Sequence, residues 1–303
     1  MNKITVLTPT YNREKYLMRM YESMLHQTKV SFQWLIVDDG STDGTEQTMK
    51  EIIENHPDNF QIDYVKKQNG GKHSALNFSH SYIKGDYVMV LDSDDYLKND
   101  AIEIICQKIS LLKKDDHIGW LAFLKGNEDG TTIDTYYERD GEITNYAAYM
   151  NAGRKGECCD VYLTSAFVSY PYPEYSDEKF ISESYLNICA TVYGEYQMIT
   201  YNEVIQVVEY MNDGLTFEGR VLQIRNPKGH AELWRQVSGK MFNSKQILKG
   251  AWLYIAYSFF DERSIDEILK KSFNKKVVLL NLPFGYAIYV IWKKKYVQKK
   301  LAG

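Results

Sequence analysis

Short apolar runs alternate with segments of helical spacing through residues 1–125 of the chain. The runs predict buried strands, because they are short and lie close to clusters of Gly, Pro, Asn or Asp. The segments between them repeat apolar residues at the spacing of an amphipathic helix. We expect strands at 4–7, 33–37, 62–65, 87–91 and 118–124, and helices at 13–26, 42–54, 72–83 and 101–112.

This alternation predicts an α/β fold with a mostly parallel sheet and helices on both faces. Ligands of such sheets bind beyond the carboxyl ends of the strands. Three polar clusters, at 8–12, 38–42 and 92–95, follow predicted strands. An ordinary turn would explain one polar cluster, but it is a poorer explanation of three clusters at one edge of the sheet. We therefore expect the functional site at this edge.

The pattern changes after residue 125. Residues 126–175 are rich in turn formers and predict no regular elements. A predicted helix and two predicted strands follow, at 179–192, 196–200 and 204–210. From Gly214 onward the chain is helical and basic, so we expect a main domain at 1–212 and a C-terminal helical region at 213–303.

Composition is that of an ordinary folded protein, with 44% hydrophobic and 25% charged residues among 303. The four cysteines form no CxxC motif and the histidines show no metal-ligand spacing, which argues against a disulfide framework and a zinc enzyme. The first apolar run is too short for a secretory signal. We therefore expect a cytoplasmic protein with reduced thiols.

Charge is divided unevenly along the chain, whose formal net charge is −4. No acidic residue follows Glu267, whereas lysines stand on both sides of the apolar segment 277–292. As a helix this segment would be roughly 24 Å long, too short to span a bilayer, and Pro283 would kink it. Its composition favours interfacial contact with an anionic membrane surface, the alternative being a helix packed on the domain or in an oligomer. The acidic body argues against nucleic-acid binding.

The cluster Asp92-Ser93-Asp94 closes a hydrophobic run. In a turn, both carboxylates can reach a common point. Carboxylate oxygens suit Mg²⁺ or Mn²⁺, which commonly take one or two protein carboxylates together with phosphate oxygens. This cluster therefore predicts a divalent ion that neutralises a diphosphate leaving group.

Together these segments resemble the motif series of the family-2 glycosyltransferases over about the first 100 residues. The resemblance rests on Val6–Arg13, Val37–Asp43, Asn69–Lys72 with Ala75 and Asn77, and Leu91–Asp95. It implies the Rossmann-like GT-A fold, a nucleotide-sugar donor that is usually UDP-linked, and transfer with inversion. Residues 1–125 would then bind the donor, and residues 126–212 would bind the acceptor and supply the catalytic base.

The resemblance also implies which residues bind the donor: Thr8, Pro9, Tyr11, Asp39, Gly71, Lys72, Asp92, Ser93 and Asp94. The first three would line the nucleotide pocket. Asp39 would accept a hydrogen bond from the uracil ring, and Gly71 and Lys72 would lie near the base and ribose. Asp92 would face the ribose or the metal, and Asp94 would bind the metal.

An inverting transfer needs a general base for the acceptor hydroxyl. In the resembling family an acidic residue at a helix start has this role, often in a Glu-Asp pair, and that pair is absent here. Glu183 is the candidate, with Asp177 and Glu178 as competitors. A carboxylate that only caps the helix is the alternative.

A second candidate site precedes the helical run that begins near Pro227. Asn226 suits the N-cap and Pro227 the first helical position. Arg225 and Lys228 would add positive charge to the free N–H groups, which together could bind a donor diphosphate or an acceptor phosphate. A capped surface helix with solvated cations explains the pattern equally well.

The sequence thus predicts a metal-dependent inverting glycosyltransferase that moves one sugar from a UDP-sugar to a saccharide acceptor. The basic tail indicates a lipid-linked acceptor, as in bacterial surface polysaccharide synthesis, and peripheral attachment at the inner face of the membrane. Two alternatives remain open: a sugar nucleotidyltransferase, and a non-catalytic module that binds nucleotide sugars or glycans.

Overall fold

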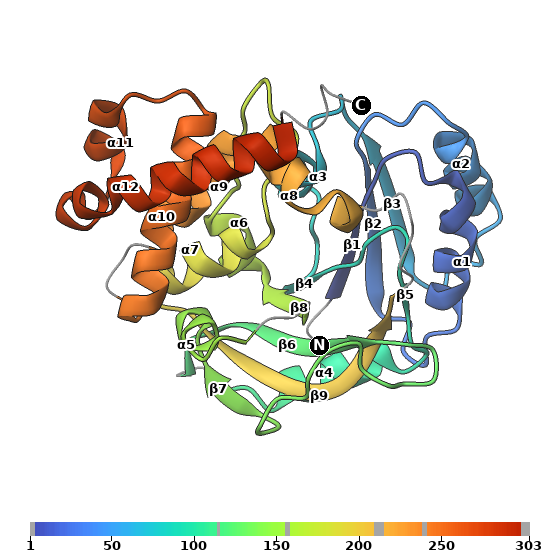
Figure 1. Ribbon diagram of the computed structural model, residues 1–303. Helices are drawn as coiled ribbons and strands as arrows, with labels where there is room; N and C mark the ends of the chain where they lie inside the picture. The colour runs from blue at the N-terminus through green and yellow to red at the C-terminus, as the bar shows by residue number, and fades with distance from the viewer. Residues whose placement is uncertain (1–3, 114–115, 155–157, 209–214, 238–240, 298–303) are drawn as a thin grey trace. The chain divides into compact units, whose positions relative to one another are not determined.

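The computed structural model describes residues 4–113, 116–154, 158–208, 215–237 and 241–297 (Figure 1). The chain divides into two compact units. Unit 1 contains residues 1–145, 155–171 and 195–211, and unit 2 contains residues 146–154, 172–194 and 212–303. The last segment of unit 2 begins at residue 212, and two earlier segments of the chain also belong to that unit.

Unit 1 is built on one sheet, with nine strands in the described residues. Its strands are β1 (Ile4–Thr10), β2 (Phe32–Asp38), β3 (Gln61–Lys66), β4 (Tyr87–Val90), β5 (Tyr96–Leu97), β6 (Ile118–Gly126), β7 (Glu142–Thr144), β8 (Cys158–Leu163) and β9 (Gln197–Val207). The order is β3-β2-β1-β4-β8-β6-β9-β5, and β7 pairs with β9.

The sheet is parallel in its first half, where β3, β2, β1 and β4 run side by side. Beyond β4 the pairing changes, because β8 lies antiparallel to both β4 and β6. Strand β9 is parallel to β6 but antiparallel to β5 and β7. The parallel half agrees with the expected strand-helix alternation, and the mixed half is formed by segments in which that alternation stops.

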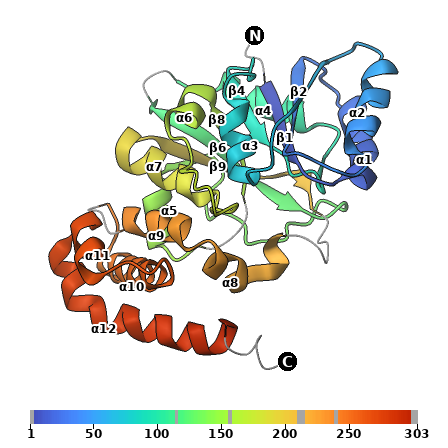
Figure 2. The ribbon, with the colours of Figure 1, turned by 90° about the horizontal axis from the view of Figure 1, so that it is seen from above.

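Helices cover both faces of this sheet (Figure 2). They are α1 (Glu14–Leu25), α2 (Thr45–Glu54), α3 (Lys72–Ser79), α4 (Ala101–Ser110) and α6 (Thr164–Ser169). Leu17 of α1, Met49 of α2 and Ile105 of α4 share one buried cluster with Trp34 of β2. Helix α3 lies against β1 and β2, and α6 lies against β4, β6 and β8. The apolar residues that repeat at helical spacing therefore pack on the faces of the sheet.

Unit 2 is helical in its described residues. Its helices are α5 (Tyr146–Asn151), α7 (Ser184–Gly194), α8 (Leu215–Arg225), α9 (Pro227–Gln236), α10 (Ser244–Phe260), α11 (Ile265–Lys271) and α12 (Lys275–Trp292), followed by a π-helical turn at Lys293–Val297. Helix α10 packs against α9 and α12, and its Tyr254 and Tyr257 are fully buried. None of the helices that the structure describes combines the length and apolar character needed to cross a bilayer.

Residues 126–175 differ from expectation, because they contain two strands and two short helices, β7, α5, β8 and α6. Strand β8 has the sequence Cys-Cys-Asp-Val-Tyr-Leu. Because Asp160 interrupts the apolar run, the sequence pattern does not indicate a strand there. The two strands expected at 196–200 and 204–210 form the single strand β9, which pairs with β6 through several register shifts. Positions 209 and 210, and Lys299 and Lys300 of the basic tail, lie outside the described residues.

Candidate active site

Three motif segments meet at the carboxyl edge of the parallel strands. Thr10, the last residue of β1, pairs in register with Asp38, the last residue of β2. The backbone N–H of Asp39 donates to the carbonyl of Thr10 over 2.8 Å, and the N–H of Leu91 donates to the carbonyl of Leu7 over 2.9 Å. Because β1 lies between β2 and β4, the polar residues that follow all three strands are neighbours at this edge.

Asp39 fixes the turn that leads into α3. One carboxylate oxygen accepts from the N–H of Gly70 and the Nζ of Lys67, at 2.9 and 2.8 Å. The other accepts from the N–H of Gly71 and the Nδ2 of Asn69, at 2.7 and 3.1 Å. Gly71 has a φ of +92°, a conformation that favours glycine. Both oxygens therefore already hold two donors, and recognition of a uracil ring by Asp39 stays a prediction that would require an exchange of partners.

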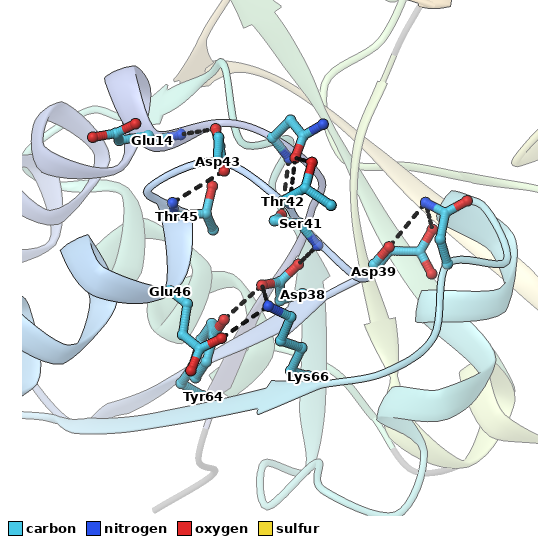
Figure 3. A network of polar contacts seen from close by, with 12 residues as sticks. Glu14, Asp38, Asp39, Ser41, Thr42, Asp43, Thr45, Glu46, Tyr64 and Lys66 are labelled. Carbon is cyan, nitrogen blue, oxygen red and sulfur yellow. Dashed lines mark hydrogen bonds and ion pairs between the residues drawn. The ribbon is translucent and has the colours of Figure 1, made fainter.

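Asp38 and Asp43 have structural contacts (Figure 3). Asp38 is fully buried and accepts from the N–H of Ser41 over 2.7 Å and from the hydroxyl of Tyr64 over 2.6 Å. Asp43 accepts from the N–H of Thr45 over 3.0 Å at the start of α2. These contacts make Asp38 a residue that fixes the turn after β2 and Asp43 a residue that binds the start of α2.

The turn after β4 contains three carboxylates, and two lysines from other elements approach them. Lys72, the first residue of α3, forms an ion pair with Asp92. Lys125 of β6 is nearly buried, and its Nζ lies 4.0 Å from a carboxylate oxygen of Asp92 and of Asp95. The carboxylate of Asp95 also accepts from the Nε2 of Gln206 over 2.5 Å. Two motifs distant in sequence, Asn69–Lys72 and Leu91–Asp95, are joined in this way.

The acidities of these carboxyls are shifted in opposite directions. Burial raises the pKa of Asp92, but the charges of Lys72 and Lys125 outweigh it and hold that pKa below its ordinary value. Burial and the negative charge of Asp92 raise the pKa of Asp94. Burial, with the charge of Asp92, raises the pKa of Asp95 to about 7. Negative charge is crowded at this turn, and a bound cation would relieve the crowding.

Among the described residues, no group of three or more His, Cys, Asp or Glu side chains is arranged to hold a metal ion by itself. Asp92 and Asp94 nevertheless fit a Mg²⁺ or Mn²⁺ that draws its remaining ligands from substrate phosphates and water. The crowded negative charge at this turn supports that fit. Ser93, between them, is buried.

The first motif, which follows β1, lies at this edge, but some of its side chains are buried in the core. The hydroxyl of Thr8 accepts from the indole N–H of Trp34 over 3.0 Å and is fully buried. Pro9 is also buried. Tyr11 is 46% exposed and is the side chain of this motif most open to a ligand. Contacts of all three with a nucleotide stay predictions.

Unit 2 carries the candidate base. Glu183 is exposed and directly precedes α7, which begins at Ser184 and not at residue 179, where the sequence predicts the helix to start. Its competitor Glu178 is buried, and its two carboxylate oxygens accept from the N–H groups of Lys228 and Gly229, at 2.6 and 2.9 Å. Burial raises the pKa of Glu178 in spite of these bonds. Glu178 is therefore an anchor for α9, and Glu183 stays the candidate for the base.

The expected anion site at the start of α9 is filled by the chain itself. Glu178 binds the free N–H groups, and the Nζ of Lys228 contacts the carboxylate of Asp177 over 2.6 Å. Asn226 occupies the N-cap position, but its side chain accepts from the N–H of Lys179 instead of capping. Arg225 is exposed. Binding of a phosphate by Arg225 and Lys228 stays a prediction that would require these carboxylates to release the site.

Lys125, Gln206 and Lys67 were not expected from the sequence. Each lies in or next to a strand: Lys125 in β6, Gln206 in β9 and Lys67 directly after β3. The available signal was a charged or amide side chain in an otherwise apolar strand, as in Trp-Leu-Ala-Phe-Leu-Lys. A buried lysine requires a partner carboxylate, but the sequence does not say which one.

The model of glycosyl transferase family 2 matches residues 5–167, more than half of the chain. The chain belongs to the family-2 glycosyltransferases. It is 37% identical to a chondroitin synthase of Pasteurella multocida over 134 residues, which are 44% of this chain but only 14% of that protein. The shared part is thus a small portion of that longer relative.

Solved structures show that this family-2 glycosyltransferase has the GT-A fold. S. aureus TarS 1–349 in complex with UDP-GlcNAc superposes with a TM-score of 0.63 at 16% identity, covering 89% of this chain and 76% of that one. The mannosyltransferase PcManGT from Pyrobaculum calidifontis, in complex with GDP-Man and Mn²⁺, gives 0.56 at 17% identity, with coverage of 97% and 83%. At these identities the likeness concerns the fold.

Proposed function

We propose that this glycosyltransferase moves a single sugar from a UDP-sugar to a saccharide acceptor, with inversion and with a divalent metal. The observation that carries the proposal is the joining of the motif turns at one sheet edge, where Lys72 pairs with Asp92 and Asp39 holds the turn before Lys72. The family match, the TarS complex with UDP-GlcNAc and the PcManGT complex with Mn²⁺ support it.

In this proposal Asp92 and Asp94 hold Mg²⁺ or Mn²⁺, which would neutralise the charge of the departing diphosphate. The chain's own residues prepare that site. Lys72 and Lys125 hold the Asp92 carboxylate from two sides, and Asp95 with Gln206 fixes the turn beneath it. A site held in place before the donor binds loses less free energy to reorganisation during transfer.

Glu183 is the proposed general base that takes the proton of the attacking acceptor hydroxyl. Its position before α7 and its exposure leave the carboxylate accessible to an acceptor. Glu178, by contrast, is buried and both of its carboxylate oxygens are bound to N–H groups, so a substrate hydroxyl cannot reach it. We propose that residues 1–125 hold the donor and that residues 126–212 contribute the acceptor site and this base.

The proposed acceptor is a lipid-linked saccharide used in bacterial surface polysaccharide synthesis, at the inner face of the cell membrane. Support comes from the matched relative, which is a chondroitin synthase, and from the basic C-terminal region. The chain covers only a small part of that relative, so the proposal does not extend to the polymer that the relative makes.

Release of free nucleotide from a panel of UDP-sugars and GDP-mannose tests the function. With Mn²⁺ or Mg²⁺ and a saccharide acceptor we expect UDP from one UDP-sugar, loss of activity with a chelator, and at least about a hundredfold lower turnover for Asp94→Asn. Asp43→Asn is the matched control, because Asp43 is exposed and its carboxylate only accepts hydrogen bonds near the start of α2.

Other products would identify the alternatives. Pyrophosphate in place of UDP would indicate a nucleotidyltransferase. Donor binding without nucleotide release across a broad acceptor panel would indicate a binding module. GDP as the product would retain the transferase but reject the proposed uridine donor.

A further inference from the structure

Helix α12 presents an apolar face to solvent. Leu280, Phe284 and Ile291 are 75%, 58% and 60% exposed, and their spacing of four and seven residues places them on one side of the helix. Leu279, Tyr286 and Val290 extend this face and are also exposed. No charged residue stands between Val277 and Trp292. The outer side of a helix on a soluble protein is normally polar, so this face indicates a partner.

The opposite side of α12 fixes the helix on α10. Asn281 is buried, and its Oδ1 accepts from the indole N–H of Trp252 over 2.6 Å. Gly285 is buried against Ile255, so close that a Cβ at position 285 would lie 2.5 Å from the Cβ of Ile255. The helix therefore has a defined rotation, and its apolar outer face is a consequence of that packing.

The end of α12 is also held. The guanidinium of Arg220 lies over the ring of Trp292, 4.3 Å from its centroid. Its Nη1 donates to the hydroxyl of Tyr257 over 2.7 Å, and the rings of Tyr257 and Trp292 lie 5.6 Å apart. Three elements of unit 2, α8, α10 and α12, are joined here, which keeps the apolar face in place up to the end of the helix.

Lysines border this face at both ends. Those that the structure describes are exposed: Lys275, Lys276, Lys293, Lys294 and Lys295. The chain contains no acidic residue after Glu267, although its net charge is −4. The two ends of α12 are therefore positive on a chain that is otherwise acidic. Its complement is a surface that is apolar inside and negatively charged at its boundary, which describes a bilayer of anionic phospholipids.

We propose that α12 binds the surface of an anionic membrane, with its apolar face at the boundary between headgroups and acyl chains and its lysines on lipid phosphates. The tyrosines of the helix suit this boundary, because each has an apolar ring and a polar hydroxyl. A second copy of the chain fits less well, since two α12 helices face to face would bring lysine clusters together. This inference goes beyond the transfer reaction and does not depend on it.

Co-sedimentation of the full chain with vesicles tests the proposal. We expect binding to equal parts of phosphatidylglycerol and phosphatidylcholine, and little binding to phosphatidylcholine alone. Leu280→Glu with Ile291→Glu should weaken binding at least about tenfold, because charge is placed in the apolar boundary. Leu111→Glu with Ile53→Glu is the matched control, because these residues of unit 1 are 71% and 42% exposed and the net charge changes by the same amount.

The lysines are tested separately. Lys293→Gln, Lys294→Gln and Lys295→Gln together should weaken binding to the anionic vesicles by about tenfold or more, and salt should do the same to the wild-type chain. Lys15→Gln, Lys84→Gln and Lys113→Gln make the same change of net charge on unit 1 and should leave binding unchanged. Thermal unfolding checks that each variant is folded.

Three results would overturn the proposal. They are failure of the folded wild-type chain to bind anionic vesicles, equal binding by the Leu280→Glu, Ile291→Glu variant, and a dimer in sedimentation velocity that this variant dissociates while vesicle binding persists. Nucleotide release from a soluble acceptor is measured on the same preparations. It tests the transferase proposal independently of the membrane.

Discussion

At the scale of single residues, the site is defined by which charges are held together. Asp39 binds four donors of its own chain, and Asp92 is held between Lys72 and Lys125. These contacts fix the motif turns. Asp39 therefore stabilises the turn before α3, whereas Asp92 and Glu183 are the carboxylates proposed to act in the transfer.

Glu183→Gln should retain donor binding but reduce sugar transfer by about a hundredfold or more, because the amide cannot accept the acceptor's proton. Donor affinity is measured by calorimetry and transfer by UDP release. Glu174→Gln is a control on another acidic residue of unit 2. Near-normal turnover of Glu183→Gln would reject the role and return attention to Asp177.

Lys125→Met should raise the KM for the donor by about tenfold, equivalent to about 1.4 kcal/mol, because Asp92 and Asp95 lose the cation near them. Lys125→Arg should restore part of the loss, since it keeps the charge. Lys84→Met removes an exposed lysine of the same unit as a control. An unchanged KM with a merely lower melting temperature would show that Lys125 serves only the fold.

At the scale of elements, close approach of helices in unit 2 depends on small residues. Gly285 of α12 lies against Ile255 of α10, and the backbone carbonyl of Trp252 is 3.0 Å from where a Cβ would be. Asn281, one turn earlier, supplies the polar contact with Trp252. The two helices are therefore held together at adjacent turns, by the close backbone approach at Gly285 and by the hydrogen bond of Asn281.

Gly285→Ala should lower the free energy of unfolding by about 2 kcal/mol, because the added methyl group overlaps Ile255. Helix propensity alone would give the opposite sign, a gain of about 1 kcal/mol. Hydrogen exchange should quicken in α10 and α12 and stay unchanged in β1, β2 and β4. Ala287→Gly on the exposed side of α12 measures the propensity effect by itself.

At the scale of the whole molecule, the chain combines two units with separate buried clusters. The cluster of unit 1 lies between its sheet and α1, α2 and α4, and those of unit 2 lie among its helices. The donor motifs belong to unit 1, whereas Glu183 and α12 belong to unit 2. The proposed chemistry therefore draws on both units, whereas the proposed membrane contact draws on unit 2 alone.

Folding should depend on pH through His230 of unit 2, which is 2% exposed and stacks on Phe180. Burial lowers its pKa to about 4 from an ordinary value of 6.5. The unfolded chain therefore binds the proton first, and the free energy of unfolding should fall by about 3 kcal/mol as pH drops from 6.5 to about 4.

Chemical denaturation of the wild type and of His230→Asn across this range measures the effect. Asn keeps a donor for the carbonyl of Asn226, which the Nδ1 of His230 contacts over 3.0 Å. The difference between the two proteins isolates this group from other titrations. Equal pH dependence of both proteins would contradict the assignment.

The sequence by itself determined the parallel half of the sheet, the four motif segments and the family. Local patterns suffice for these, because apolar runs, helical spacing and turn residues act between near neighbours. It also indicated a basic C-terminal segment with an apolar centre.

Only the tertiary structure decided which charges meet. Three contacts join residues far apart in sequence: β8 lies between β4 and β6, Lys125 approaches Asp92, and Glu178 binds the start of α9. Packing also decided which side of α12 is exposed. A pattern along the chain records how polar a position is. The partner of a buried charge, and the side of an apolar helix that is left uncovered, are set by packing in three dimensions.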